Sequence, residues 1–300
     1  MPFRISWERS WRWVAVLIAA CLFALALTRS TAGDDTVQAT LSQKAGFISL
    51  VPGITETLVA LEETEALVGR SDWCVGPEAV ERLPSMGSLL TPNLESIALV
   101  QPATVLADGS AAAGLDDLSA IARVEVLPWL RAAEVASSVR RLGEMLGREE
   151  PSERLAEDFD ALAKAQPEED APRVLLALQG SLQQGEVWYI RPHSLHGEAL
   201  AMAGYRNAVE EPISGPPVLS LERLLQLSPD AIVVLSALPV TEHERAQWIE
   251  QWSVFSTLEA VKGGKVTVLG GAETLSTGPL VLNLPKRLRE SLRSMGVDRS

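Results

Sequence analysis

Two similar stretches decide the fold of this chain: NLESIALVQPATVL at residues 93–106, and SLERLLQLSPDAIV at residues 220–233, which lies 127 positions later. Each begins with a residue that commonly caps helices, Asn93 or Ser220, continues with a Leu-Glu pair and an apolar stripe, and then reaches a proline. A short apolar run follows each proline. The pattern predicts in both places a helix that leads into a buried strand, and therefore two related α/β lobes. The alternative is a chance likeness of two generic helix–strand units. A solenoid would need at least three short repeats.

Short apolar runs alternate with helical segments on both sides of these stretches. The predicted strands are 47–51, 66–68, 104–107 and 124–127 in the first lobe, and 174–178, 186–190, 231–235 and 265–269 in the second. Strands that alternate with helices form parallel sheets whose two faces are covered. We therefore expect an α/β fold with two parallel-sheet lobes.

A helical connection is predicted between the lobes. Apolar residues recur at helical spacing from Val135 to Leu146, and Pro151 opens a second long helix that reaches Gln166. A final amphipathic helix is expected over 280–295. We expect two lobes joined by a long backbone helix, with a ligand cleft between the lobes. The predicted divisions are a first lobe at 46–130, a helical connection at 131–172 and a second lobe at 173–300.

Residues 1–32 have the layout of a secretory signal peptide. Three arginines precede an uncharged run from Trp13 to Thr28, and small residues lead to Ala32. The run is somewhat shorter than the roughly 20 residues that cross a bilayer. We expect export to the periplasm with cleavage after Ala32, and an uncleaved N-terminal anchor is the alternative. Cys21 follows Leu-Ile-Ala-Ala and also resembles a lipoprotein box, but the apolar run continues to Leu27, where a lipoprotein normally turns polar.

The charge of the chain limits its partners. The net charge is −13, and loss of residues 1–32 would leave 22 basic and 38 acidic residues, a net charge of −16. Nucleic acid and anionic membrane surfaces need a cationic face, so neither is an expected partner. The sequence contains no G-x-S-x-G elbow, no H-E-x-x-H helix and no phosphate-binding P-loop, so we expect a protein that is not an enzyme.

An ordered series of motifs resembles a known family. They are ISLVP at 48–52 followed by Thr-Glu at 55–56, VGRSDWC at 68–74, Gly87, Gly197, AGYRN at 203–207, Trp-Ser at 252–253 and VKGGKV at 261–266. Together with the repeat, they resemble the helical-backbone substrate-binding proteins of bacterial ABC importers, the class that handles cobalamin, ferric siderophores and haem. The resemblance implies a monomeric receptor that captures a corrinoid or ferric chelate, holds no resident cofactor and delivers its ligand to a permease.

The resemblance also assigns a role to the two repeats. In this family one glutamate on each lobe docks to arginines of the membrane permease, and the matching residues here are Glu95 and Glu222. A two-lobed receptor that binds a two-fold permease needs equivalent acidic anchors, and the repeat provides them. The alternative is that both glutamates only complement the positive ends of their helix dipoles.

Candidate ligand-binding residues in the first lobe are Pro52, Asp72 and Trp73. Cobalamin receptors of this family carry an aromatic residue at the position that matches Trp73, where a flat macrocycle packs against it. Those receptors usually also carry a tryptophan just before the second repeat. This chain has Gly-Pro-Pro at 215–217, which weakens the corrinoid assignment.

Candidate ligand-binding residues in the second lobe are Trp188, Tyr189, Arg191 and His193. The two aromatic residues fit a ligand pocket or the lobe core equally well. His193 and His196, three residues apart, are able to bind a metal or haem iron, and ordinary loop residues are the alternative, so we assign no metal site. A haem or other metal receptor, or a sensor of the same fold without a ligand, remains the alternative function.

Overall fold

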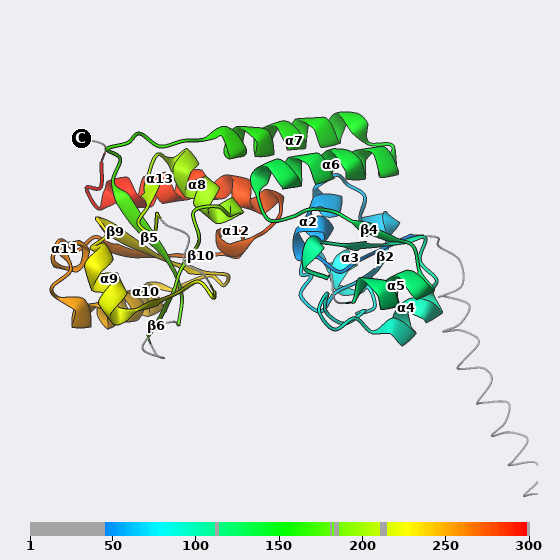
Figure 1. The fold of residues 1–300 in the computed structure, drawn as a ribbon, viewed down its shortest axis with the longest axis horizontal. Helices are drawn as coiled ribbons and strands as arrows, with labels where there is room; N and C mark the ends of the chain where they lie inside the picture. The colour runs from blue at the N-terminus through cyan, green and yellow to red at the C-terminus, as the bar shows by residue number, and fades with distance from the viewer. Residues whose placement is uncertain (1–45, 112–113, 181, 183–185, 211–214, 299–300) are drawn as a thin grey trace, which may run out of the picture.

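The structure is a computed structural model that describes residues 46–111, 114–180, 182, 186–210 and 215–298 (Figure 1). The predicted signal peptide, the cleavage site at Ala32 and the possible lipoprotein box at Cys21 lie outside these residues. No helix within the described ranges combines the length and the apolar character needed to span a membrane.

Strands and helices alternate along the first lobe. Its elements are β1 (Phe47–Ser49), α2 (Pro52–Ala60), β2 (Leu67–Arg70), α3 (Glu78–Glu81), α4 (Leu94–Val100), β3 (Thr104–Ala107), α5 (Leu115–Ile121) and β4 (Val124–Val126). Two helices then lead to the second lobe, α6 (Ala132–Leu146) and α7 (Glu149–Lys164). The predicted pair of consecutive helices between the lobes is therefore present, and α6 and α7 run along one side of both lobes in Figure 1.

The second lobe repeats the alternation. Its elements are β5 (Arg173–Leu178), β6 (Glu186–Trp188), α8 (Leu195–Ala203), β7 (Arg206–Asn207), β8 (Val218–Ser220), α9 (Leu221–Leu227), β9 (Ala231–Ser236), α10 (Glu242–Gln251), α11 (Glu259–Lys262), β10 (Val266–Gly270), α12 (Ala272–Leu275) and α13 (Leu284–Ser294). The predicted final helix is divided, because a 3₁₀ helix, η5 (Pro279–Asn283), precedes α13. Pro285 in the first turn of α13 lacks an N–H group, which suits the start of a helix.

The two parallel sheets have the same strand order. The first is β2-β1-β3-β4, and the second, written from its other edge, is β7-β5-β9-β10. Phe47 of β1 pairs with Thr104 of β3, and Val174 of β5 pairs with Ala231 of β9. Each partner in the second pair lies 127 positions after its counterpart, the same offset that relates the two sequence stretches. The prediction of two related α/β lobes is confirmed.

The predicted strand at 186–190 belongs to a different sheet. It ends at Trp188 as β6, and β6 pairs antiparallel with β8 rather than joining the parallel sheet. Residues beyond it run back beside β5, where Ala177 forms an isolated antiparallel bridge with Tyr189. This two-stranded sheet is an addition to the shared strand order of the lobes.

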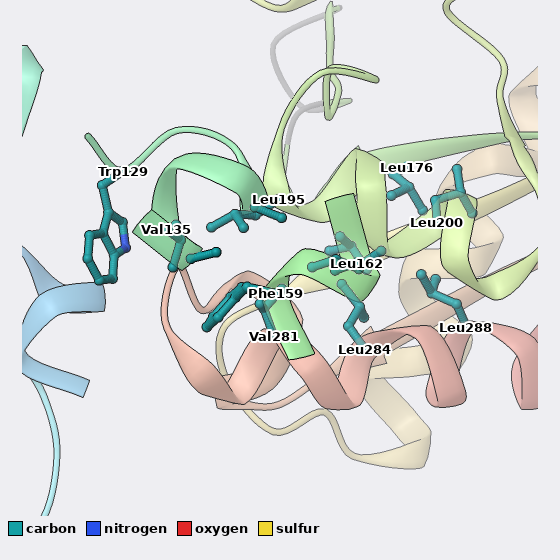
Figure 2. Close-up of a cluster of buried hydrophobic side chains, with 14 of the residues drawn as sticks. Trp129, Val135, Phe159, Leu162, Leu176, Leu195, Leu200, Val281, Leu284 and Leu288 are labelled. Atoms are coloured by element: carbon teal, nitrogen blue, oxygen red, sulfur yellow. The ribbon is translucent and has the colours of Figure 1, made fainter. Parts of the chain in front are cut away.

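One cluster of buried apolar side chains extends from the first lobe through the connection into the second lobe. In Figure 2, Trp129 lies at the end of this cluster beside the first lobe, Phe159 and Leu162 of α7 lie in its middle, and Leu288 of α13 lies toward the other end. Each of these α7 and α13 side chains is fully buried. Full burial of one such side chain contributes roughly 1.5–3 kcal/mol, so the connection is held to the second lobe by hydrophobic packing as well as by the chain.

Candidate functional site

The carboxyl ends of the two parallel sheets face each other. Trp129 follows β4, and its indole Nε1 donates a hydrogen bond of 2.8 Å to the carbonyl oxygen of Thr277, which lies beyond β10. Gly53, which follows β1, packs so closely on the same residue that an added Cβ would lie 2.6 Å from the Thr277 oxygen. We call the described residues that follow the carboxyl ends of the parallel strands the facing edges. Ligands of open α/β sheets bind outside such ends.

A partly buried carboxylate joins the facing edges. Glu56 of α2 accepts hydrogen bonds from the Ser276 hydroxyl, with Oε1 and Oε2 at 2.9 and 2.8 Å from Oγ, and from the backbone N–H of Leu280. Burial raises the pKa of Glu56 above its ordinary value, and the hydrogen bonds from Leu280 and Ser276 oppose this shift. Gly278 leaves room for this carboxylate, because a Cβ there would lie 2.8 Å from the Glu56 carboxyl carbon. Sequence reasoning missed Glu56 as a residue that joins the lobes.

The candidate residues of the first lobe directly follow two neighbouring strands, β1 and β2, and so belong to its facing edge. Pro52 is the exposed first residue of α2, and Asp72 and Trp73 directly follow β2. The Trp73 side chain is 71% exposed, and Asp72 Oδ1 accepts a hydrogen bond from the Ser85 hydroxyl. An indole this exposed on a facing edge is free to stack on a flat ligand.

A buried polar cluster supports the Trp73 turn. The Cys74 Sγ accepts a hydrogen bond of 2.9 Å from Thr55 Oγ1 and lies 3.1 Å from Ser71 Oγ. The Ser71 hydroxyl in turn accepts a hydrogen bond of 3.3 Å from the backbone N–H of Trp73. Thr55, Ser71 and Cys74 are all buried. Sequence reasoning did not connect Thr55 with Ser71, since only the fold places the start of α2 beside the end of β2.

The structure separates Trp188 from Tyr189. Side chains along a strand point alternately to opposite faces. Val187 and Tyr189 are accordingly buried in the core of the second lobe, with Tyr189 2% exposed, whereas Trp188 between them is 37% exposed. Tyr189 therefore packs in the lobe core, which is the alternative that the sequence left open for it. Trp188 stays a candidate.

Arg191, His193 and His196 do not form a common site. The guanidinium of Arg191 donates to the carbonyl oxygen of Gly215. Ser194 caps α8, which leaves His193 exposed before the helix and places His196 in its buried first turn. Burial lowers the pKa of His196 to about 4, and its Nε2 has no hydrogen-bond partner. Among the described residues, no group of three or more His, Cys, Asp or Glu side chains is placed to hold a metal ion.

The two repeated helices have the same local structure. Asn93 accepts a hydrogen bond at the start of α4, as Ser220 does at the start of α9, and both helices end at a residue in the left-handed region. Glu95 and Glu222 are the second residues of these helices, and both are exposed. Figure 1 shows α4 and α9 on the side of the lobes away from α7. No ion pair with either glutamate is formed by the residues that the structure describes.

Curated relatives are similar to this chain over most of its length. The vitamin B12-binding protein of Yersinia pseudotuberculosis is 26% identical over 215 residues, which cover 68% of this chain and 74% of the relative. The vitamin B12-binding protein of Pectobacterium atrosepticum is 26% identical over 216 residues, which cover 69% of this chain and 77% of that protein.

Solved structures share the fold. The periplasmic vitamin B12-binding protein of Vibrio cholerae superposes with a TM-score of 0.67 at 20% identity, and the match covers 84% of this chain and 98% of that one. A periplasmic haem-binding protein from Pseudomonas aeruginosa superposes with a TM-score of 0.63 at 23% identity, covering 84% of this chain and 92% of that one. These likenesses confirm the fold class of two parallel-sheet lobes with a helical connection.

A family match covers most of the chain. Residues 48–272 match the family described as periplasmic binding protein, and these residues include both repeats and the helical connection. The relatives and the structural neighbours are binding proteins, in agreement with the expectation that this protein is a receptor and not an enzyme. The chain therefore belongs to the periplasmic binding protein family.

Proposed function

We propose that this protein is the extracytoplasmic receptor of an ABC importer, which captures a corrinoid or a ferric chelate and delivers it to the permease. The observation that carries the proposal is the meeting of two carboxyl edges from lobes of identical strand order, in a chain of the periplasmic binding protein family. The curated relatives named above bind vitamin B12, which favours a corrinoid.

The facing edges supply the contacts for capture. Pro52, Asp72 and Trp73 are exposed on the first lobe, and Trp188 is partly exposed on the second. An indole can cover one face of a macrocycle, and a binding site that contacts both lobes needs few other polar groups to orient it. The tie between Glu56 and Ser276 holds the two edges at a fixed spacing. We expect capture with little hinge motion for that reason.

Delivery is assigned to Glu95 and Glu222. Both carboxylates are exposed at equivalent places on the two lobes, so a permease with two-fold symmetry and basic side chains can contact both at once. The overall negative charge of the chain favours a basic partner as well.

The test is a calorimetric titration of the purified protein, without residues 1–32, with cyanocobalamin, haemin and a set of ferric siderophores. Binding of cyanocobalamin or a siderophore at micromolar concentration is the expected result. Binding of haemin alone would replace the corrinoid or siderophore with haem, and the receptor role would stand. Absence of binding by all the compounds would favour a sensor or scaffold of the same fold and would remove the transport proposal.

A further inference from the structure

Each repeated helix exposes a leucine on the turn that follows its glutamate. Leu99 of α4 lies four residues after Glu95 and is 60% exposed, and Leu225 of α9 lies three residues after Glu222 and is 44% exposed. Residues three or four apart lie on the same side of a helix. Both helices therefore present a carboxylate and an apolar side chain to solvent on one face. We call these two faces, Glu95 with Leu99 and Glu222 with Leu225, the paired helix faces.

The opposite side of each helix attaches it to its lobe. Ile97 and Val100 of α4 are buried, as is Leu224 of α9. These buried side chains pack against the lobe cores, whereas Leu99 and Leu225 keep about half or more of their surface in water. The two exposed leucines are therefore available to a partner.

The repeat does not by itself account for the two leucines. The residue 127 positions after Leu99 is Gln226, and the residue 127 positions before Leu225 is Ala98. Four residues turn a helix slightly further than one full turn and three residues slightly less, so each leucine flanks its glutamate on a different side. A leucine beside each glutamate is thus a property of both lobes that the duplicated sequence did not supply.

The charge of the paired helix faces limits what can cover them. Glu95 and Glu222 are both exposed, and the chain has a net charge of −13. Arg223, which follows Glu222, is also exposed, and its guanidinium donates to the Gln226 side chain at 3.3 Å. A second copy of this chain would bring carboxylates toward carboxylates. A partner with basic side chains set beside apolar ones complements both helices.

We infer that the permease covers both paired helix faces, and that Leu99 and Leu225 carry a large part of the docking affinity. The inference rests on the receptor function proposed above and specifies the chemistry of its partner. An ion pair that stays in water contributes little, because solvent and salt screen it. Burial of the leucine beside each ion pair removes apolar surface from water and keeps water away from the pair, as at interface hot spots.

Uptake by cells of the native host that lack this gene tests the inference. The wild type, the double variant Leu99→Gln/Leu225→Gln and the double variant Leu99→Met/Leu225→Met are expressed at a low level, so that docking limits the initial uptake of labelled cyanocobalamin. Glutamine and methionine have similar length and helix propensity, so the two variants differ mainly in polarity. We expect uptake to fall about tenfold in the glutamine variant and to stay within about twofold of wild type in the methionine variant.

The outcomes separate docking from capture. Both double variants should keep the wild-type melting temperature and the wild-type Kd for cyanocobalamin, because the replaced side chains are exposed and lie outside the facing edges. Wild-type uptake by the glutamine variant would overturn the inference and leave the receptor function intact. An equal loss in both variants would also overturn it, because polarity would then not matter. If the wild type restores no uptake of cyanocobalamin, haemin or ferric siderophores, the receptor function fails and the inference fails with it.

Sedimentation of the purified protein tests the rival occupant, a second copy of this chain. We expect the wild type and both double variants to sediment as monomers. A wild-type dimer that the substitutions Leu99→Gln and Leu225→Gln dissociate would assign the paired helix faces to self-association and would overturn the inference.

Discussion

The carboxylate of Glu56 and the hydroxyl of Ser276, 220 positions apart in the chain, form a hydrogen bond across the meeting point of the two lobes. Glu56 belongs to the first helix of the first lobe and Ser276 follows the last strand of the second. The contact therefore fixes the geometry between the facing edges, together with the bond from Trp129 to Thr277. Glu56 is also a partly buried titratable group, so the contact can be tested through stability and through its pH dependence.

Replacement of Glu56 should weaken the joint between the lobes. Glu56→Ala leaves the N–H of Leu280 and the hydroxyl of Ser276 without their acceptor, so we expect a loss of about 1–3 kcal/mol in the free energy of unfolding, measured by urea denaturation. Glu56→Gln keeps an acceptor and should cost less. Glu65→Gln, at an exposed position, is the control, and a loss there as large as for Glu56→Ala would refute the assignment.

The pH dependence of the same variants has a defined sign. The pKa of Glu56 is raised by burial, so the folded state holds the proton more tightly than the unfolded state. Its contribution to stability is present below the unfolded pKa, near 4.5, and is lost as the pH rises through the folded pKa. Wild-type protein should therefore lose stability relative to Glu56→Gln over this interval. A constant stability difference between the two proteins across this pH interval would contradict a raised pKa of Glu56.

His196 should make the protein sensitive to acid. Its pKa is lowered by burial to about 4 from an ordinary value of 6.5, so the folded state favours the neutral ring. Its contribution is complete above pH 6.5 and is lost as the pH falls toward 4, by up to about 3 kcal/mol. Denaturation curves of His196→Leu should show a shallower decline over this range than wild type. His193→Gln, at an exposed position, should retain the wild-type decline.

Trp73 should contribute to ligand affinity and not to folding. Its side chain is 71% exposed, so Trp73→Ala should leave the melting temperature within a degree or so of wild type. Among the compounds of the calorimetric titration, the one that binds most tightly should show a Kd about tenfold higher, because stacking on the indole is lost. Leu90→Ala, which removes a side chain that is 77% exposed outside the facing edges, is the matched control. An equal effect of the two variants on affinity would argue against contact between Trp73 and ligand.

Charge reversal at the repeated helices should separate delivery from capture. Glu95→Lys and Glu222→Lys each remove one exposed anchor, and the double variant should abolish uptake in cells while the Kd for the ligand stays unchanged. Glu157→Lys places the same charge on α7, away from α4 and α9, and should leave uptake normal. An uptake rate of the double variant equal to that of wild type would show that both glutamates only complement the positive ends of their helix dipoles.

The ends of the repeated helices carry strain that a glycine would relieve. Gln101 and Ser228 adopt φ values of 51° and 41°, in the left-handed region that non-glycine residues seldom occupy. Gln101→Gly should raise the free energy of unfolding by about 0.5–1 kcal/mol, measured with urea. Ala98→Gly, inside α4, should lower it by about 1 kcal/mol, because glycine there gains no relief and loses more backbone entropy. Loss of stability in both Gln101→Gly and Ala98→Gly would contradict backbone strain at Gln101.

Much of the fold could be read from local patterns. The capping residues Asn93 and Ser220 and the prolines that follow predicted α4 and α9. Apolar runs predicted the strands of the two parallel sheets with small shifts at their ends, except β7, which was missed because it has only two residues. These features depend on neighbours along the chain, so sequence carries them. The two-stranded sheet of β6 and β8 was not predicted, because the pairing of Glu186 with Ser220 joins residues far apart in sequence.

The candidate site was only partly predictable. The motif around Asp72 and Trp73 placed two exposed residues correctly beyond β2. The pattern could not decide between Trp188 and Tyr189, because a strand presents alternate residues to core and solvent and its register is set by the partner strand. The spacing of His193 and His196 suggested a pair. Because α8 begins after the cap residue Ser194, His193 is exposed before the helix and His196 is buried within its first turn.

The sequence by itself determined the duplicated helix–strand unit and the acidic composition, because each follows from the residues alone. Only the tertiary structure decided that the facing edges meet across the lobes, that Glu56 lies partly buried at their junction and that Tyr189 lies in the core. Burial and hydrogen bonding between residues more than a hundred positions apart arise from packing of complete lobes. No local pattern encodes which loops that packing brings together.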